Sequence, residues 1–197
     1  MSAGAPTLLT DLASVKTWLG ITTTGSDAQL TALIAAVSGS IRLYCNRNFG
    51  TATYTETYDG SGTGRQWMNQ RPVTAVSSIT LNGVAMTQRP SNNVGGYGWT
   101  FNRNELLFAG GVFGAGFQNL TVAYTAGLTY SQTNYPDLWQ AAVEWVGIIY
   151  RAATRIGKLS EGLANNTTAF LVNDIPFEVK TVLDGYKQVS PVQSLEM

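Results

Sequence analysis

The residue types that perform most protein chemistry are scarce in this chain of 197 residues, which has no histidine and a single cysteine, Cys45. Without histidine there is no Ser-His-Asp or Cys-His catalytic machinery, no HExxH zinc site and no side chain that ordinarily shuttles protons near neutral pH. Cys45 has no imidazole to activate its thiol, and a free cysteine in a helical pattern is usually a small core residue. We therefore expect no nucleophilic catalysis, no metal site and no cofactor.

Carboxylates are the remaining candidates for catalysis. A glycosidase-like reaction needs two carboxyl groups that flank a glycosidic bond, and here it would have to use residues such as Glu56 or Glu105. The chain has only twelve acidic residues, and no pair stands out by its spacing. We therefore expect that the protein is not an enzyme.

The glycine-rich segment 91–117 could in principle cradle a phosphate group. However, it contains no GxxxxGK[ST] pattern, and its glycines do not lie between a clear strand and a helix. Turns, or loops that adapt to a partner, are the better interpretation. Because the segment also holds Trp99 and several asparagines, a carbohydrate- or receptor-binding β-module stays open as an alternative function.

The formal net charge is zero, from twelve basic and twelve acidic residues, and charged residues make up 12% of the chain. That share is about half of the usual quarter, and a weakly charged surface is more tolerable when neighbouring subunits cover much of it. A protein that grips duplex DNA normally has a basic surplus. Residues 1–6 resemble no signal peptide, and no run approaches the roughly 18 apolar residues of a membrane span. We expect no membrane partner, and the lone Cys45, which excludes an internal disulfide, fits a reducing cytoplasm.

Helical periodicity appears at both ends of the chain. Thr10 or Asp11 can cap a helix over about 11–19 that Gly20 ends. Ser26 and Gln29 form a capping-box pattern that opens a second helix over about 27–46. A long helix over 136–157 begins at a proline, and a short one follows Pro176. We expect no regular structure over 162–173 and an exposed tail over 188–197.

Between these helices the hydrophobic period changes to two, which is typical of strands. Asn82-Gly83 is a strong hairpin signal. Five to seven short antiparallel strands are expected from the segments 51–58, 65–68, 77–81, 99–101, 106–108 and 120–124. The predicted fold is α+β: a small bundle of about four helices, from 8–50 and 134–188, with an inserted antiparallel β-module over 51–125. We expect the two parts to form a single domain.

The long helix 136–157 has an apolar arc wider than the roughly 100° that one core contact needs. One stripe holds Leu138, Ala142, Trp145 and Ile149, and an adjacent stripe holds Trp139, Val143, Val146 and Tyr150. Either the helix lies between the helical pair and the β-module, or part of the second stripe packs on a neighbouring subunit.

Two further groups extend this candidate interface. Arg151, Arg155 and Lys158 compensate a helix dipole, or they face an acidic partner or a DNA channel. The short last helix docks on its own core or on a partner. The full predicted interface is Trp139, Val143, Val146, Tyr150, Arg151, Arg155, Lys158, Val179, Val182, Leu183 and Tyr186.

Several of these segments, in this order and spacing, resemble the head–tail connector (adaptor) family of tailed bacteriophages and gene transfer agents. The matching positions span residues 8 to 186 and include Leu12, Val15, Trp18-Leu19-Gly20-Ile21, Asp27, Leu30, Ile34, Ile41, Tyr44, Asn46-Arg47-Asn48-Phe49, Arg71-Pro72-Val73, Val76, Ile79, Tyr124-Thr125-Ala126-Gly127, Val182, Leu183 and Tyr186. The β-insert over 51–125 is longer than in the smaller members of that family.

This resemblance implies a non-enzymatic subunit of the virion neck, made in the host cytoplasm. Such subunits form a ring of twelve copies under the portal protein, extend the DNA channel and provide a platform for stopper or tail proteins. DNA passes through the lumen without sequence-specific binding. Ring closure needs two different patches on each subunit, and we expect the portal to template a ring from monomers.

Overall fold

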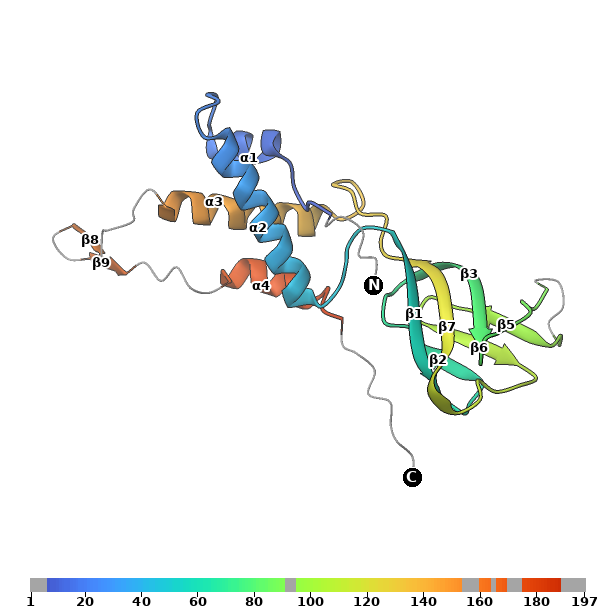
Figure 1. Ribbon diagram of the computed structural model, residues 1–197. Coiled ribbons are helices and arrows are strands. Elements are labelled where there is room, and N and C mark those ends of the chain that lie inside the picture. The colour runs from blue at the N-terminus through green and yellow to red at the C-terminus, as the bar shows by residue number, and fades with distance from the viewer. Residues whose placement is uncertain (1–6, 91–94, 154–159, 164–165, 170–174, 189–197) are drawn as a thin grey trace. The chain divides into compact units, whose positions relative to one another are not determined.

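The computed structural model describes residues 7–90, 95–153, 160–163, 166–169 and 175–188, and they cluster into two compact units (Figure 1). The helical unit comprises Thr7–Asn46 and Tyr130–Gln188, and the β unit comprises Arg47–Thr129. Within these ranges, four helices and antiparallel sheets confirm the predicted α+β fold.

The first two helices begin and end close to their predicted limits. Helix α1 spans Leu12–Leu19, where the Asp11 side chain accepts a hydrogen bond from the Ser14 backbone N–H at 2.9 Å. Gly20 ends it in the left-handed region, at φ 72°, as a C-terminal glycine should. Helix α2 spans Asp27–Cys45, but Ser26 makes no side-chain capping bond. The predicted capping box is therefore wrong, because the Ser26 hydroxyl lies 2.8 Å from the Tyr150 hydroxyl instead.

Helix α3 spans Pro136–Ala153 and contacts each of the other three helices. Residues 154–157 of the predicted long helix lie outside the described residues. Helix α4 spans Phe177–Asp184. The core of the helical unit is built from apolar side chains of all four helices, among them Val15, Leu30, Ile34, Val37, Ile41, Leu138, Ala142, Val143, Val146, Val179 and Leu183.

A short hairpin lies between α3 and α4, where no regular structure was expected. Strand β8 spans Ser160–Leu163 and pairs with β9, Asn166–Ala169, in an antiparallel register. The expectation for 162–173 was wrong over this part. The reason is that the two four-residue strands are too short and too polar to show the alternating apolar pattern on which strand prediction depends.

The β unit contains a four-stranded and a three-stranded sheet (Figure 1). The first has the order β1-β7-β3-β4, with β1 Ala52–Gly60, β7 Gly116–Ala126, β3 Val73–Leu81 and β4 Val84–Ala85. The second has the order β2-β6-β5, with β2 Arg65–Trp67, β6 Glu105–Ala109 and β5 Gly98–Phe101. Each strand pairs antiparallel with its neighbours, so the predicted hairpin segments are confirmed.

Both sheets contribute to one hydrophobic core. Tyr54 and Val122 from the first sheet, and Trp99 and Leu106 from the second, belong to the same buried cluster. The Asn82-Gly83 turn has positive φ at both residues, 51° and 77°, as a two-residue type I′ turn requires. Gly127 has φ 125°, and a Cβ there would lie 2.2 Å from the Gly50 carbonyl oxygen, so this position needs glycine.

Candidate interface surfaces

The two valines of the predicted interface on α3 fill the core of the helical unit. Val143 is 1% exposed and Val146 is fully buried. Neither side chain reaches the surface of the chain, so neither offers a contact to a partner in this conformation. The second stripe is therefore divided along its length: its middle packs inside the unit, and only its ends, Trp139 and Tyr150, are partly exposed.

Trp139 lines a shallow groove of about 530 Å³ on the helical unit. The groove is also formed by Leu8, Leu12, Ile34 and Tyr130. The backbone N–H of Trp139 donates a hydrogen bond to the Tyr135 carbonyl at 3.1 Å. The Tyr130 hydroxyl donates a hydrogen bond to the Leu9 carbonyl. Burial is the main cause that raises the pKa of Tyr130, and the negative charge of Asp137 raises it further. This groove is a feature that could accept an apolar side chain.

The other end of the stripe is tied to α2. The Tyr150 hydroxyl lies 2.8 Å from Ser26, so this side chain is only partly available to a neighbour. Arg151 is exposed at the C-terminal end of α3, where its positive charge interacts favourably with the negative end of the helix dipole. Arg155 and Lys158, the other two members of the predicted basic group, lie outside the described residues.

Helix α4 docks on its own helical unit. Val179 is 1% exposed and Leu183 is fully buried. The Tyr186 hydroxyl donates to both carboxylate oxygens of Asp137 at 2.8 Å, and the Gln188 N–H donates to the Cys45 carbonyl at 2.8 Å. Of the predicted contact residues on this segment, only Val182 and Tyr186 keep part of their surface exposed.

Several exposed apolar residues of the helical unit were not predicted as interface residues. Trp18 is 50% exposed and lies over Gly147, where a Cβ would meet its indole ring at 3.2 Å. Gly147 itself is buried. Among the described residues of this unit, the other large apolar side chains that are exposed are Leu8, Leu43, Ile148 and Phe177. For Ile148 the signal in the sequence was an apolar residue beside the polar residues of an amphipathic helix.

Helix α2 is long and apolar enough to cross a membrane when judged by length and composition only. Leu30, Ile34, Val37 and Ile41, on one side of the helix, are buried inside the helical unit, as expected for a core helix. Its exposed side carries small residues such as Ala32 and Ala36, together with Leu43.

In the β unit, Glu56 takes part in a cluster with two tyrosines. The Tyr124 hydroxyl donates to Glu56 Oε2 at 2.6 Å, and the Tyr58 hydroxyl donates to the same oxygen. Burial raises the pKa of both tyrosines well above the ordinary value, and the bond to Glu56 raises it further. The tyrosine oxygens also accept the backbone N–H groups of Asn69 and Gln70, at 3.3 and 3.2 Å. The cluster therefore fastens the segment after β2 to the first sheet.

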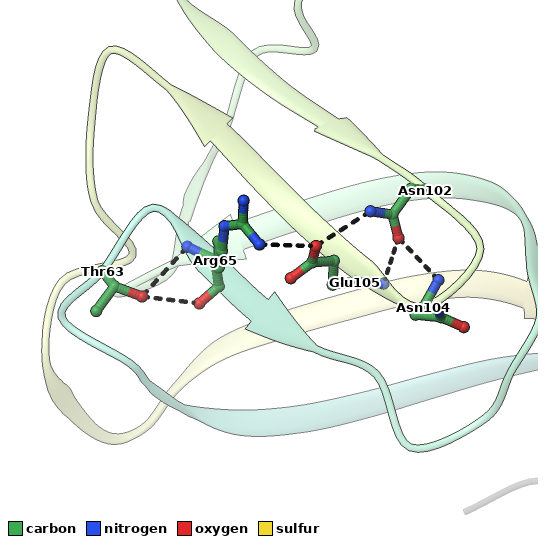
Figure 2. Close-up of polar contacts among 5 residues, drawn as sticks. All are labelled: Thr63, Arg65, Asn102, Asn104 and Glu105. Carbon is green, nitrogen blue, oxygen red and sulfur yellow. Dashed lines mark hydrogen bonds and ion pairs between the residues drawn. The ribbon is translucent and has the colours of Figure 1, made fainter. Parts of the chain in front are cut away.

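Glu105 lies in a second polar network, at the turn between β5 and β6 (Figure 2). Its Oε1 accepts from Asn102 at 3.1 Å and from the largely exposed Arg65 at 3.4 Å. Asn102 in turn accepts the backbone N–H groups of Asn104 and Glu105, at 2.8 and 2.9 Å, which shapes the turn. Glu56 and Glu105 thus lie on strands of different sheets, each within its own network. Within the described ranges, no three His, Cys, Asp or Glu side chains could hold a metal ion.

Trp99, the residue on which a carbohydrate-binding surface depended, is 3% exposed. Its indole N–H donates to the Met86 carbonyl at 3.0 Å, and its ring belongs to the core of the β unit. A sugar cannot stack on a buried ring, so this observation removes the residue that supported the alternative function. Among the described residues of segment 91–117, the exposed aromatic side chains are Tyr97 and Phe117.

Solved structures with a similar fold come from gene transfer agent particles, two of them from the neck and one from the virion. The neck of an empty gene transfer agent particle, with C6 symmetry, matches at 17% identity and a TM-score of 0.57, covering 92% of this chain and 91% of that chain. The neck of the native particle, with C12 symmetry, matches at 17% identity and a TM-score of 0.59, covering 98% and 96%. The virion of the native particle matches at 16% identity and a TM-score of 0.58 with the same coverage.

No curated protein sequence matches the chain significantly. The profile of the Head completion protein family matches residues 8–189. This range includes every helix and strand that the structure describes. The chain belongs to the Head completion protein family.

Proposed function

We propose that this protein is a structural head–tail connector subunit in the neck of a tailed bacteriophage or gene transfer agent. In this function it forms a ring under the portal, extends the DNA channel and provides the platform on which stopper or tail proteins assemble. The observation that carries the proposal is the family match over residues 8–189. The fold likeness to chains of gene transfer agent necks, one of them with C12 symmetry, supports a ring of twelve copies.

The surface of the helical unit supports an assembled state. Trp18, Ile148 and Phe177 expose 48–79% of their area, and tryptophan and phenylalanine are enriched in protein interfaces. The groove beside Trp139 adds a concave surface lined by both apolar and polar side chains. A ring needs two different patches on each subunit. The exposed apolar side chains and the groove beside Trp139 are two such patches.

The charge of the chain supports a channel through which DNA moves. A subunit with equal numbers of acidic and basic residues releases few counterions on contact with DNA, because that release scales with the number of phosphates neutralised. DNA is therefore not held by the ring wall. In this function the protein performs no catalysis.

The proposal is tested by mixing the purified protein with its portal and imaging the complex. We expect a monomer in size-exclusion chromatography with light scattering when the portal is absent, and a twelve-fold ring on the tail side of the portal when it is present. A variant with Trp18→Ala and Ile148→Ala should lose ring formation, whereas Tyr97→Ala, which removes an exposed aromatic ring from the β unit, should keep it. Failure of the unmodified protein to bind the portal would refute the proposal.

A further inference from the structure

Strand β1 is a free sheet edge. In the order β1-β7-β3-β4 it has a neighbour on one side only, and among the described residues no backbone hydrogen bond reaches the other side of Ala52–Tyr58. This stretch pairs with β7 residue by residue, from Ala52 opposite Ala126 to Tyr58 opposite Leu120. An uninterrupted edge of this kind presents a row of unpaired N–H and C=O groups to another strand.

The opposite side of the same sheet is protected. Strand β4 covers only Thr80 and Leu81 of β3, and the rest of β3 has two register shifts, between Val73 and Ala75 and between Val76 and Ser78. At these irregularities the Thr74 and Ser77 hydroxyls donate to carbonyls of β7, at 3.1 and 2.9 Å. Bulges are a usual way to prevent unwanted strand pairing. β1 has no proline and no lysine, and its register stays regular from Ala52 to Tyr58.

The exposed side chains of β1 also favour pairing with a strand. Thr53, Thr55 and Thr57 are exposed, and they alternate with Tyr54, Glu56 and Tyr58, which face the core side. Threonine is a good strand former and makes favourable cross-strand pairs. The exposed side chains along this edge are therefore short, uncharged and β-branched.

The β8–β9 hairpin is the complementary feature. Its two strands have four residues each and form a sheet of their own. A two-stranded hairpin is marginal in water and gains stability from a further strand. The sequence of β9, Asn166-Thr167-Thr168-Ala169, suits pairing better than that of β8, which contains Glu161 and Gly162.

We propose that β9 of one copy of this chain pairs with the β1 edge of the next copy, so that the hairpin extends the four-stranded sheet of its neighbour. The contact joins two different features of the same chain, which is the heterologous arrangement that closes a ring. Six residues connect α3 to β8 and seven connect β9 to α4. A six-residue connection spans at most about 20 Å, which is the distance from the end of α3 within which the β1 edge of the next copy must lie. This inference rests on the proposed ring.

Cysteine crosslinking in rings assembled on the portal tests the pairing. Thr55→Cys is combined in one chain with either Thr167→Cys or Thr168→Cys. The native Cys45 is buried, so it should not take part in the crosslinks. Neighbouring strand residues point to opposite faces, so one of the two combinations should give a ladder of covalent multimers on oxidation and the other should not. Rings of any single variant should give no multimers.

The remaining outcomes are distinct. A crosslink confined to single chains would overturn the inference, because β9 would then pair with its own β1. Intact rings that crosslink in neither combination would also overturn it, while the proposed function would stand. Absence of any ring from the unmodified protein on the portal would refute the proposed function, and this inference with it.

A matched pair of substitutions gives a second test. Thr55→Lys places a charge on the free edge, whereas Ala75→Lys places the same charge at an exposed position of the bulged β3 edge. Both variants should keep the melting temperature of the parent. Thr55→Lys should abolish ring formation on the portal and Ala75→Lys should not. Equal ring yields from the two variants would contradict the assignment of β1 as the docking edge.

Discussion

Leu183 and Val182 are adjacent on α4 but have different environments. Leu183 is fully buried, whereas Val182 keeps part of its surface exposed. Leu183→Ala should lower the free energy of unfolding by about 2–5 kcal/mol, because it removes buried methyl groups and leaves a cavity. Val182→Ala should cost clearly less. Urea unfolding followed by circular dichroism measures both, and equal losses would show that α4 is not docked as described.

The Glu56–Tyr58–Tyr124 cluster predicts a loss of stability in alkali. The pKa of both tyrosines is raised in the folded protein, so the folded chain retains protons that the unfolded chain releases near its ordinary pKa of about 10. Their contribution to stability is therefore complete below about pH 10 and decreases as the pH rises beyond it. Unfolding free energies at about pH 8 and about pH 11 should differ less for Tyr124→Phe than for the parent. An equal difference in both proteins would contradict the assignment.

The burial of individual residues on helix 136–157 could not be predicted from the sequence. The width of the apolar arc on helix 136–157 was visible in the sequence, but not which part of it is buried. Val143 and Val146 are core residues, and Trp18 and Ile148 are exposed. The difference depends on where α1 lies: Trp18 covers Gly147, and helical periodicity within α3 contains no information about that contact.

At the scale of elements, the helices and the main strands followed from local chemistry. Asp11 and Gly20 limit α1, and Asn82-Gly83 forms the turn between β3 and β4, because caps and two-residue turns depend on a few adjacent residues. Elements that depend on distant partners were not predicted. The Ser26 hydroxyl contacts the Tyr150 hydroxyl and makes no capping bond. The β8–β9 hairpin lacks the alternating apolar pattern of a half-buried strand.

Hydrogen exchange should distinguish the two sides of strand β1. In the isolated protein, the amides of Ala52–Tyr58 that point toward β7 should be protected, and the alternating amides that point away should exchange rapidly. In rings assembled on the portal, both sets should be protected, because a further strand then accepts the outward N–H groups. NMR of the monomer and mass spectrometry of the ring measure this, with β3 as the internal reference. Rapid exchange that persists in the ring would show that the edge stays unpaired.

For the whole molecule, net charge is the property that relates most directly to DNA passage. Twelve basic and twelve acidic residues leave no surplus to neutralise phosphates, and the logarithm of DNA affinity decreases with that of salt concentration by about 0.9 for each phosphate contact. We expect the portal-bound ring to retain no more linear duplex DNA than the portal alone, with a salt dependence no steeper. A filter-binding titration over a range of salt concentrations measures both quantities. A variant with Glu178→Lys and Asp184→Lys, two exposed positions on α4, provides a positive control for added charge on the helical unit. Additional affinity with a slope of several units for the unmodified ring would contradict a lumen through which DNA slides, and would require a basic inner surface formed only on assembly.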